Sequence, residues 1–196
     1  MAISQIISSA LVILTVMSRS HAADTNRPLV AIYTSDGRWT SERPEPQVIA
    51  ALWADGQIIW SATNSGRPYR QGRFSPDKLN TLLAKLDRKG VFTNQSLARP
   101  NVGPDSSFTT IAIDDGRRQL KMESWHEFFE RNTNLVATAS GIEPLAGRVR
   151  ERVLQGQPAE YRNYRSTWSE IRQAVTGLIP ATGEAYKGEI PISNKR

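Results

Sequence analysis

The chain has 196 residues, of which 39% are hydrophobic, and it carries a net charge of +6 at pH 7. It contains no cysteine, which excludes disulfide bonds, thiolate metal sites and a cysteine nucleophile. The excess of positive charge is moderate, so it permits a polyanionic partner but does not require one.

The amino terminus has the pattern of a cleavable signal peptide. Residues 6–16 are apolar except for two serines and one threonine, and this run is shorter than the ~20 residues of a membrane-spanning helix. Ser20-His21-Ala22 follows, with small residues where signal peptidase cleaves, and predicts a cut after Ala22 or after Ala23. The first five residues lack Lys and Arg, so an uncleaved anchor or a buried helix is the alternative.

These features predict a periplasmic or secreted bacterial protein with no stable membrane anchor after cleavage. Small domains secreted by animals and plants usually carry disulfides, and this chain has none. We expect residues 1–22 to be the signal peptide, 23–186 to form a single domain and 187–196 to be a flexible tail.

The first half of the domain has the pattern of short strands. A β-rich run covers 29–34, and two further runs, 48–53 and 58–61, flank Asp55-Gly56. Asp-Gly between two apolar runs predicts a hairpin with a type I′ turn. Polar segments rich in Pro or Gly predict loops at 38–46 and 64–72.

A helix is predicted next. Ser75 can cap its amino end, Pro76 is favoured at the first helical position, and Gly90 is typical of a left-handed stop. Four leucines at helical spacing form one apolar stripe: Leu79, Leu82, Leu83 and Leu86.

A second hairpin and more helices are predicted after a loop at 93–106. Strands at 108–114 and 118–123 flank Asp115-Gly116, and Ser124 with Glu127 matches a capping box, so a helix should start at Trp125. Its apolar face would hold Trp125, Phe128 and Phe129.

The carboxy-terminal part is predicted to be mainly helical. Residues 135–138 fit either a short strand or the end of the preceding helix, and Glu143-Pro144 indicates a new helix start. The last helix should cover 159–178. The chain as a whole predicts an α+β fold with an antiparallel sheet of about four to five strands, built from hairpins, and helices packed on one face.

The segment Gln47–Phe92 combines the Asp-Gly hairpin, a Gly-rich loop, Ser-Pro-Asp at a helix start and a leucine helix that ends in Gly-Val-Phe. In this segment, about a quarter of the chain, the protein resembles uncharacterised exported ββα domain proteins found in many bacterial genomes. That resemblance implies an exported α+β domain and supplies no active site.

His126 is the one histidine outside the predicted signal peptide. On a helix, His126 and Glu130 would share a face with Glu127 between them, which is similar to the zinc-peptidase pattern H-E-x-x-H with the second His replaced by Glu. A catalytic zinc needs three protein ligands, and no third is identified, so we expect no metal site and no cofactor. A hydrolase-type enzyme centred on His126, with Glu127 and Glu130, is the alternative to a binding function.

An aromatic and basic surface is the leading candidate for function. Two predicted loops hold Arg38, Trp39, Arg43, Tyr69 and Arg70, residue types that contact glycans, peptides or anions. We therefore expect a non-catalytic binding or interaction module of the bacterial envelope, with a glycan, a peptide or a polyanion as partner. A second alternative is polyanion binding through the arginine-rich helices between Arg148 and Arg172.

Overall fold

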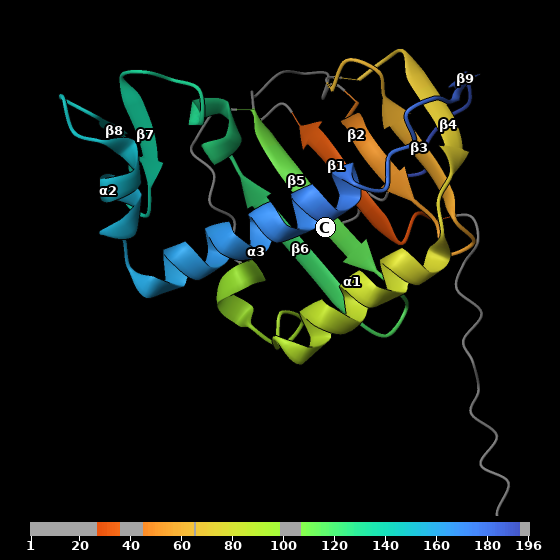
Figure 1. The fold of residues 1–196 in the computed structure, drawn as a ribbon, viewed down its shortest axis with the longest axis horizontal. Coiled ribbons are helices and arrows are strands. Elements are labelled where there is room, and N and C mark those ends of the chain that lie inside the picture. Colours follow the sequence, from red (N-terminus) through yellow and green to blue (C-terminus); the bar gives the residue numbers. More distant parts are fainter. Residues whose placement is uncertain (1–26, 36–44, 65, 99–106, 193–196) are drawn as a thin grey trace, which may run out of the picture.

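The computed structural model describes residues 27–35, 45–64, 66–98 and 107–192. Its architecture is α+β, as predicted, and its main sheet has seven strands in the order β6-β5-β1-β2-β3-β4-β9 (Figure 1). All neighbouring strands of this sheet are antiparallel. The sheet is therefore larger than the four to five strands expected.

β1 (Val30–Ser35) is an interior strand that joins two groups of strands. On one side it pairs with β2 (Gln47–Leu52), and on the other with β5 (Phe108–Asp114). The first four residues of β1 are all buried, so both faces of the sheet are covered at this point.

The two predicted hairpins are present, but their turns differ from the type I′ form. They join β2 to β3 (Gln57–Ser61) and β5 to β6 (Gln119–Ser124). A type I′ turn needs positive φ at two successive residues, whereas of Asp55 and Gly56 only Gly56 has it, at +88°. The backbone amide of Trp53 donates to the carbonyl of Gln57 at 2.9 Å, so three residues form the loop and glycine takes its left-handed position.

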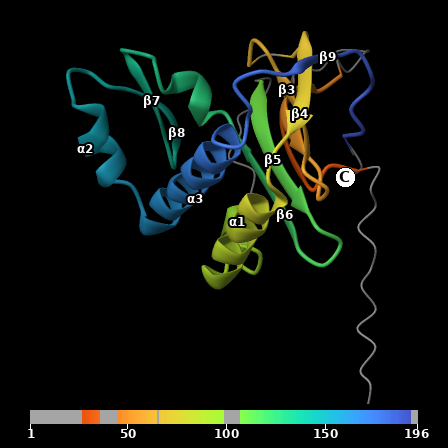
Figure 2. The same cartoon turned by 45° about the vertical axis from the view of Figure 1, so that its right-hand side comes forward.

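Two helices cover one face of the sheet (Figures 1 and 2): α1 (Pro76–Arg88) and α3 (Ala159–Thr176). The predicted leucine stripe of α1 is buried between helix and sheet. Gly90 stops α1 with φ +68°, and Val91 donates back to the Leu86 carbonyl at 3.1 Å, which completes the predicted left-handed stop. Ser75 precedes the helix but makes no capping hydrogen bond with its side chain.

Several predictions about elements are wrong. β4 (Tyr69–Arg73) lies where the loop 64–72 was expected, because its backbone pairs with β3 although its side chains are mostly polar. The helix expected from Trp125 is a single 3₁₀ turn, η2 (His126–Phe129), in which Phe128 is 50% exposed. The predicted capping box does not form either, because the carboxylate of Glu127 accepts hydrogen bonds from α3 instead.

A small lobe precedes α3 at one end of the sheet (Figures 1 and 2). It contains a two-stranded sheet, β7 (Leu135–Thr138) and β8 (Gly141–Pro144), and the short helix α2 (Arg150–Gln155). Residues 135–138 are thus a strand, and Glu143-Pro144 ends a strand rather than starting a helix. Among the described residues, none of the helices combines the length and apolar character needed to span a bilayer.

Two shorter elements complete the fold: η1 (Gln95–Ala98), which buries Leu97 in the core, and β9 (Glu184–Tyr186) at the edge of the sheet. Beyond β9 the chain continues to Ile192, and Ile190 and Ile192 pack against the face of the sheet opposite the helices. Up to Ile192, the segment predicted as a loose tail from Lys187 is therefore in contact with the domain.

Candidate functional site

Two groups of polar side chains lie along α3. One is buried around His126, where η2 meets α3, and the other is exposed in a groove between α3 and α1. The two groups differ in solvent exposure. A ligand can reach only an exposed group, so exposure decides which one is a candidate site.

The His126 side chain is 4% exposed and is held by hydrogen bonding and ring contacts. Its Nδ1 lies 2.5 Å from the Oγ of Ser124, which is itself fully buried at the end of β6. The rings of Tyr164 and Trp168, one turn apart on α3, approach the imidazole edge-on. His126 thus fixes the end of the sheet against α3.

Glu127 points from η2 to α3 and bridges two of its side chains. One carboxylate oxygen accepts hydrogen bonds from the indole nitrogen of Trp168, at 2.8 Å, and from Nε of Arg172, at 2.7 Å. Glu130, at the end of the same turn, pairs with Arg165. Both carboxylates proposed for an enzyme are therefore engaged in holding η2 on α3.

The surroundings of His126 favour its neutral form. Burial lowers the pKa of His126 from 6.5 to about 3, and the positive charges of Arg165 and Arg172 act in the same direction. The Oε1 of Glu130 is 4.0 Å from Nε2, too far for a hydrogen bond. Because Ser124 and His126 are both buried, this hydroxyl–imidazole pair presents no nucleophile to a substrate at the surface.

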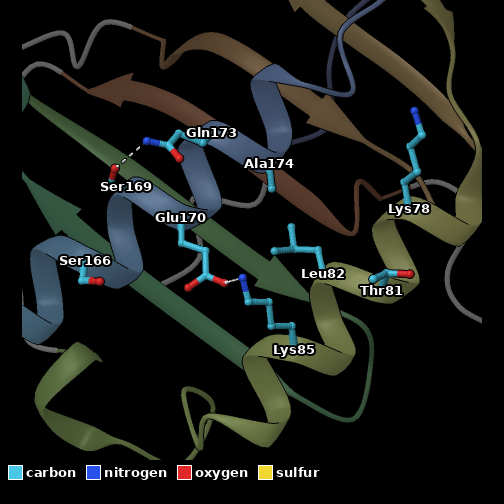
Figure 3. Close-up of a pocket in the computed structure, with 9 residues that line it drawn as sticks. All are labelled: Lys78, Thr81, Leu82, Lys85, Ser166, Ser169, Glu170, Gln173 and Ala174. Atoms are coloured by element: carbon cyan, nitrogen blue, oxygen red, sulfur yellow. Dashed lines mark hydrogen bonds and ion pairs between the residues drawn. The ribbon is translucent and has the colours of Figure 1, made fainter.

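The exposed group lines an open groove of about 690 Å³ between the two helices (Figure 3). From α1 come Lys78, Thr81, Leu82 and Lys85, and from α3 come Ser166, Ser169, Glu170, Gln173 and Ala174. Apart from Leu82, Ala174 and Glu170, the lining side chains are exposed. The groove therefore offers hydroxyl, amide and ammonium groups to a ligand.

Glu170 is the centre of charge in the groove. Its Oε1 lies 2.6 Å from Nζ of Lys85, and its Oε2 pairs with Lys89. Burial alone would raise the pKa of Glu170, but the hydrogen bonds and charges of the two lysines outweigh it and hold that pKa below its usual value. The groove thus holds two ammonium groups, those of Lys78 and Lys85, and one carboxylate, which Lys89 also contacts from outside the lining.

The predicted aromatic and basic surface is only partly within the described residues. Arg38, Trp39 and Arg43 lie outside them. Tyr69 and Arg70 are successive residues of β4 and so point to opposite faces of the sheet. Tyr69 is 9% exposed within an apolar cluster, whereas Arg70 is exposed and lies close enough to donate to the Gly183 carbonyl, at 3.4 Å.

Most of the arginines between Arg148 and Arg172 are tied to neighbouring groups. Arg148, Arg150 and Arg162 donate to backbone carbonyls, and Arg165 and Arg172 pair with glutamates. A guanidinium that already satisfies carbonyl or carboxylate oxygens is less free to bind a polyanion. These contacts weaken the case for a polyanion site on these helices.

Comparison with protein-family models, with curated proteins and with solved structures finds no significant match. Within the described ranges, no three His, Asp or Glu side chains lie together as a metal site would require.

Sequence reasoning did not identify the groove. Lys78, Thr81 and Lys85 are spaced along one side of α1, and Ser166, Ser169 and Gln173 along one side of α3, so each set is visible as the polar side of a helix. No local pattern indicates that these two sides face each other, because α1 and α3 are about 80 residues apart in the chain.

Proposed function

We propose that the chain is an exported, non-catalytic binding module of the bacterial envelope, and that it holds an anionic ligand in the groove between α1 and α3. One observation carries this proposal: Lys78, Lys85 and Glu170 line an open groove with exposed hydroxyls and an amide, and Lys89 pairs with the same glutamate.

The chemistry of the groove favours a carboxylate or phosphate group. Lys85 and Lys89 share one carboxylate, which leaves them with excess positive charge, and Lys78 adds a further ammonium group. Ser166 and Ser169 supply hydroxyls on the α3 side of the groove, whereas the Thr81 hydroxyl already donates to the Asp77 carbonyl at 2.8 Å. Hydroxyls and ammonium groups together are common partners of anionic groups.

A binding role also agrees with the buried state of His126. The imidazole is neutral at pH 7 and is enclosed by Ser124 and by the rings of α3, so its contacts account for it as a structural residue. General acid–base catalysis would require the imidazole to reach a proton of the substrate.

Binding of two polymers to the full-length protein tests the groove. Polyphosphate presents phosphate groups and alginate presents carboxylates, so the pair distinguishes the two chemistries. Lys78→Glu and Lys85→Gln should weaken binding of the preferred polymer by about tenfold, which corresponds to about 1.4 kcal/mol. Arg117→Glu is the matched control, since this exposed residue lies in the β5–β6 turn, outside the groove. Unchanged affinity in both lysine variants would refute the groove as the site.

Export is supported by the sequence of residues 1–22 and needs its own test. Mass spectrometry of the protein from fractionated bacterial cells should find an amino terminus at Ala23, or at Asp24, in the envelope or the medium. An intact Met1 in the cytoplasmic fraction would refute export while leaving the binding experiment independent of it.

A further inference from the structure

The carboxy-terminal segment crosses from one face of the sheet to the other. After α3 the chain passes over the edge of β4, forms β9 and continues along the face opposite α1 and α3 (Figure 2). We call residues 184–192 the C-terminal strap. Its side chains Tyr186, Ile190 and Ile192 pack against the sheet and are themselves only partly buried.

The face beneath the strap is a compact apolar cluster. Each of its members is at most 9% exposed, and they come from β2, β3, β4 and the loop after β2: Val48, Ala51, Trp53, Ile59 and Tyr69. Two of the five are aromatic, and aromatic rings provide large contact areas at binding interfaces.

The strap is held by few directional bonds. β9 pairs with β4 over three residues only, and two of these, Glu184 and Ala185, are exposed. Among the described residues, the hydrogen bonds of 187–192 are local: Tyr186 Oη donates to the Glu189 carbonyl, and the Ile192 amide donates to the Ile190 carbonyl. Short pairing and partial burial are features of segments that open at low free-energy cost.

Gly183, just before the strap, packs closely against the sheet. A Cβ added at Gly183 would overlap the Trp60 ring and would come within 2.6 Å of the Gln71 carbonyl oxygen. Gly183 thus fixes the point at which the chain reaches the sheet, and the strap begins directly after it.

We propose that the edge of β4 and the apolar face beside it form a binding site for an extended peptide of another protein, and that the C-terminal strap occupies this site within the chain. The peptide would add a strand to β4, as in β-strand addition, and would place two aliphatic residues, two positions apart, where Ile190 and Ile192 lie. Nε2 of Gln71 on β4 donates to a carboxylate oxygen of Glu184 in the strap at 3.4 Å, which favours a peptide that also carries a carboxylate at this position. This site is separate from the groove between α1 and α3.

Peptide binding to the full-length chain tests the proposal. The probe is a fluorescein-labelled peptide with the sequence of residues 184–192. Ile190→Asp with Ile192→Asp in the full-length chain should release the strap, so the peptide should bind this double variant about tenfold more tightly than the wild type. A peptide with Asp in place of both isoleucines should not bind. Phe128→Asp, at an exposed apolar residue on η2, is the matched control and should bind the peptide as the wild type does.

Hydrogen exchange of the wild type gives a second measurement that does not depend on a variant. Amides of β9 should exchange at least about tenfold faster than those of β3, because strap opening is local. The proposal is overturned if β9 is protected as well as β3, or if the peptide fails to bind the folded double variant. A dimeric mass by light scattering without peptide binding would also overturn it, in favour of strap exchange between two copies of the chain.

Discussion

The Oγ of Ser124 lies 2.5 Å from Nδ1 of His126, and both side chains are buried. The two residues are separated by Trp125 alone, so the turn that ends β6 brings the hydroxyl back to the imidazole. This pair, with Tyr164 and Trp168 around it, makes the junction of η2 and α3 sensitive to the protonation of one group.

The first prediction concerns acid stability. The pKa of His126 is lowered from 6.5 to about 3 in the folded state, so the contribution of His126 to stability is complete above pH 6.5 and falls as the pH drops toward 3. Between these limits the wild type should lose up to about 1.4 kcal/mol of unfolding free energy per pH unit through this group. Urea unfolding between pH 7 and pH 4.5 measures the slope, and His126→Gln should flatten it. Equal slopes in both proteins would contradict the prediction.

The second prediction compares two glutamates of the same turn. Glu127→Ala removes the acceptor of Trp168 Nε1 and of Arg172 Nε, and should cost about 1–3 kcal/mol because the indole donor is left buried without a partner. Glu130→Ala removes a carboxylate that is 41% exposed and paired with Arg165, and should cost less than about 1 kcal/mol. Chemical denaturation measures both values. A larger loss for Glu130→Ala would show that the bridge to Trp168 is not the stronger link.

The third prediction compares two glycines near the end of α3. Gly183→Ala would force its new methyl group against Trp60 and the Gln71 carbonyl, and should destabilise the protein by about 1–3 kcal/mol. Gly177→Ala is the control, because at φ −68° its Cβ would meet no atom closer than 3.4 Å. That variant should be neutral or should stabilise the protein by up to about 1 kcal/mol, because alanine reduces the entropy of the unfolded chain. Thermal unfolding measures the change in melting temperature of each variant. The melting temperature should fall for Gly183→Ala and should stay the same or rise for Gly177→Ala.

The fourth prediction concerns the arginine that joins the β5–β6 turn to α1. Arg118 donates from Nε to Asp115 at 2.8 Å, and its NH1 is 3.2 Å from a carboxylate oxygen of Asp87. Lysine keeps the charge but loses this forked geometry, so Arg118→Lys should cost about 1 kcal/mol. Arg117→Lys, at the exposed neighbouring residue, should leave the unfolding free energy unchanged within about 0.5 kcal/mol. Equal costs for the two variants would contradict the role assigned to the fork.

Sequence patterns correctly predicted the elements that depend on interactions between residues close together in the chain. The Asp-Gly pairs marked both hairpins, and the leucine spacing with Gly90 marked α1 and its end, since these signals involve residues close together in the chain. β4 was missed because Arg70, Gln71 and Arg73 are polar, so its strand character comes from pairing with β3 rather than from burial of its side chains.

The candidate site was harder to predict for the same reason. Glu127 matches a capping box in the sequence, but its partners Trp168 and Arg172 are more than 40 residues away in the chain, and their contacts with it displace the local role. The groove likewise depends on how two distant helices pack on the sheet. The amino-acid sequence shows the polar side of each helix, but it does not show that the two sides face each other.

The order of the strands has a consequence for the growing chain. β1, β2, β3 and β4 are consecutive in the sequence and adjacent in the sheet, while β5 and β9, which close the two sides of this block, both come later. A nascent polypeptide that ends at Arg73 therefore carries four paired strands and two open sides, each able to bind a foreign strand. Neither side gains its neighbouring strand from within the chain until β5 and then β9, which ends at Tyr186, have been made.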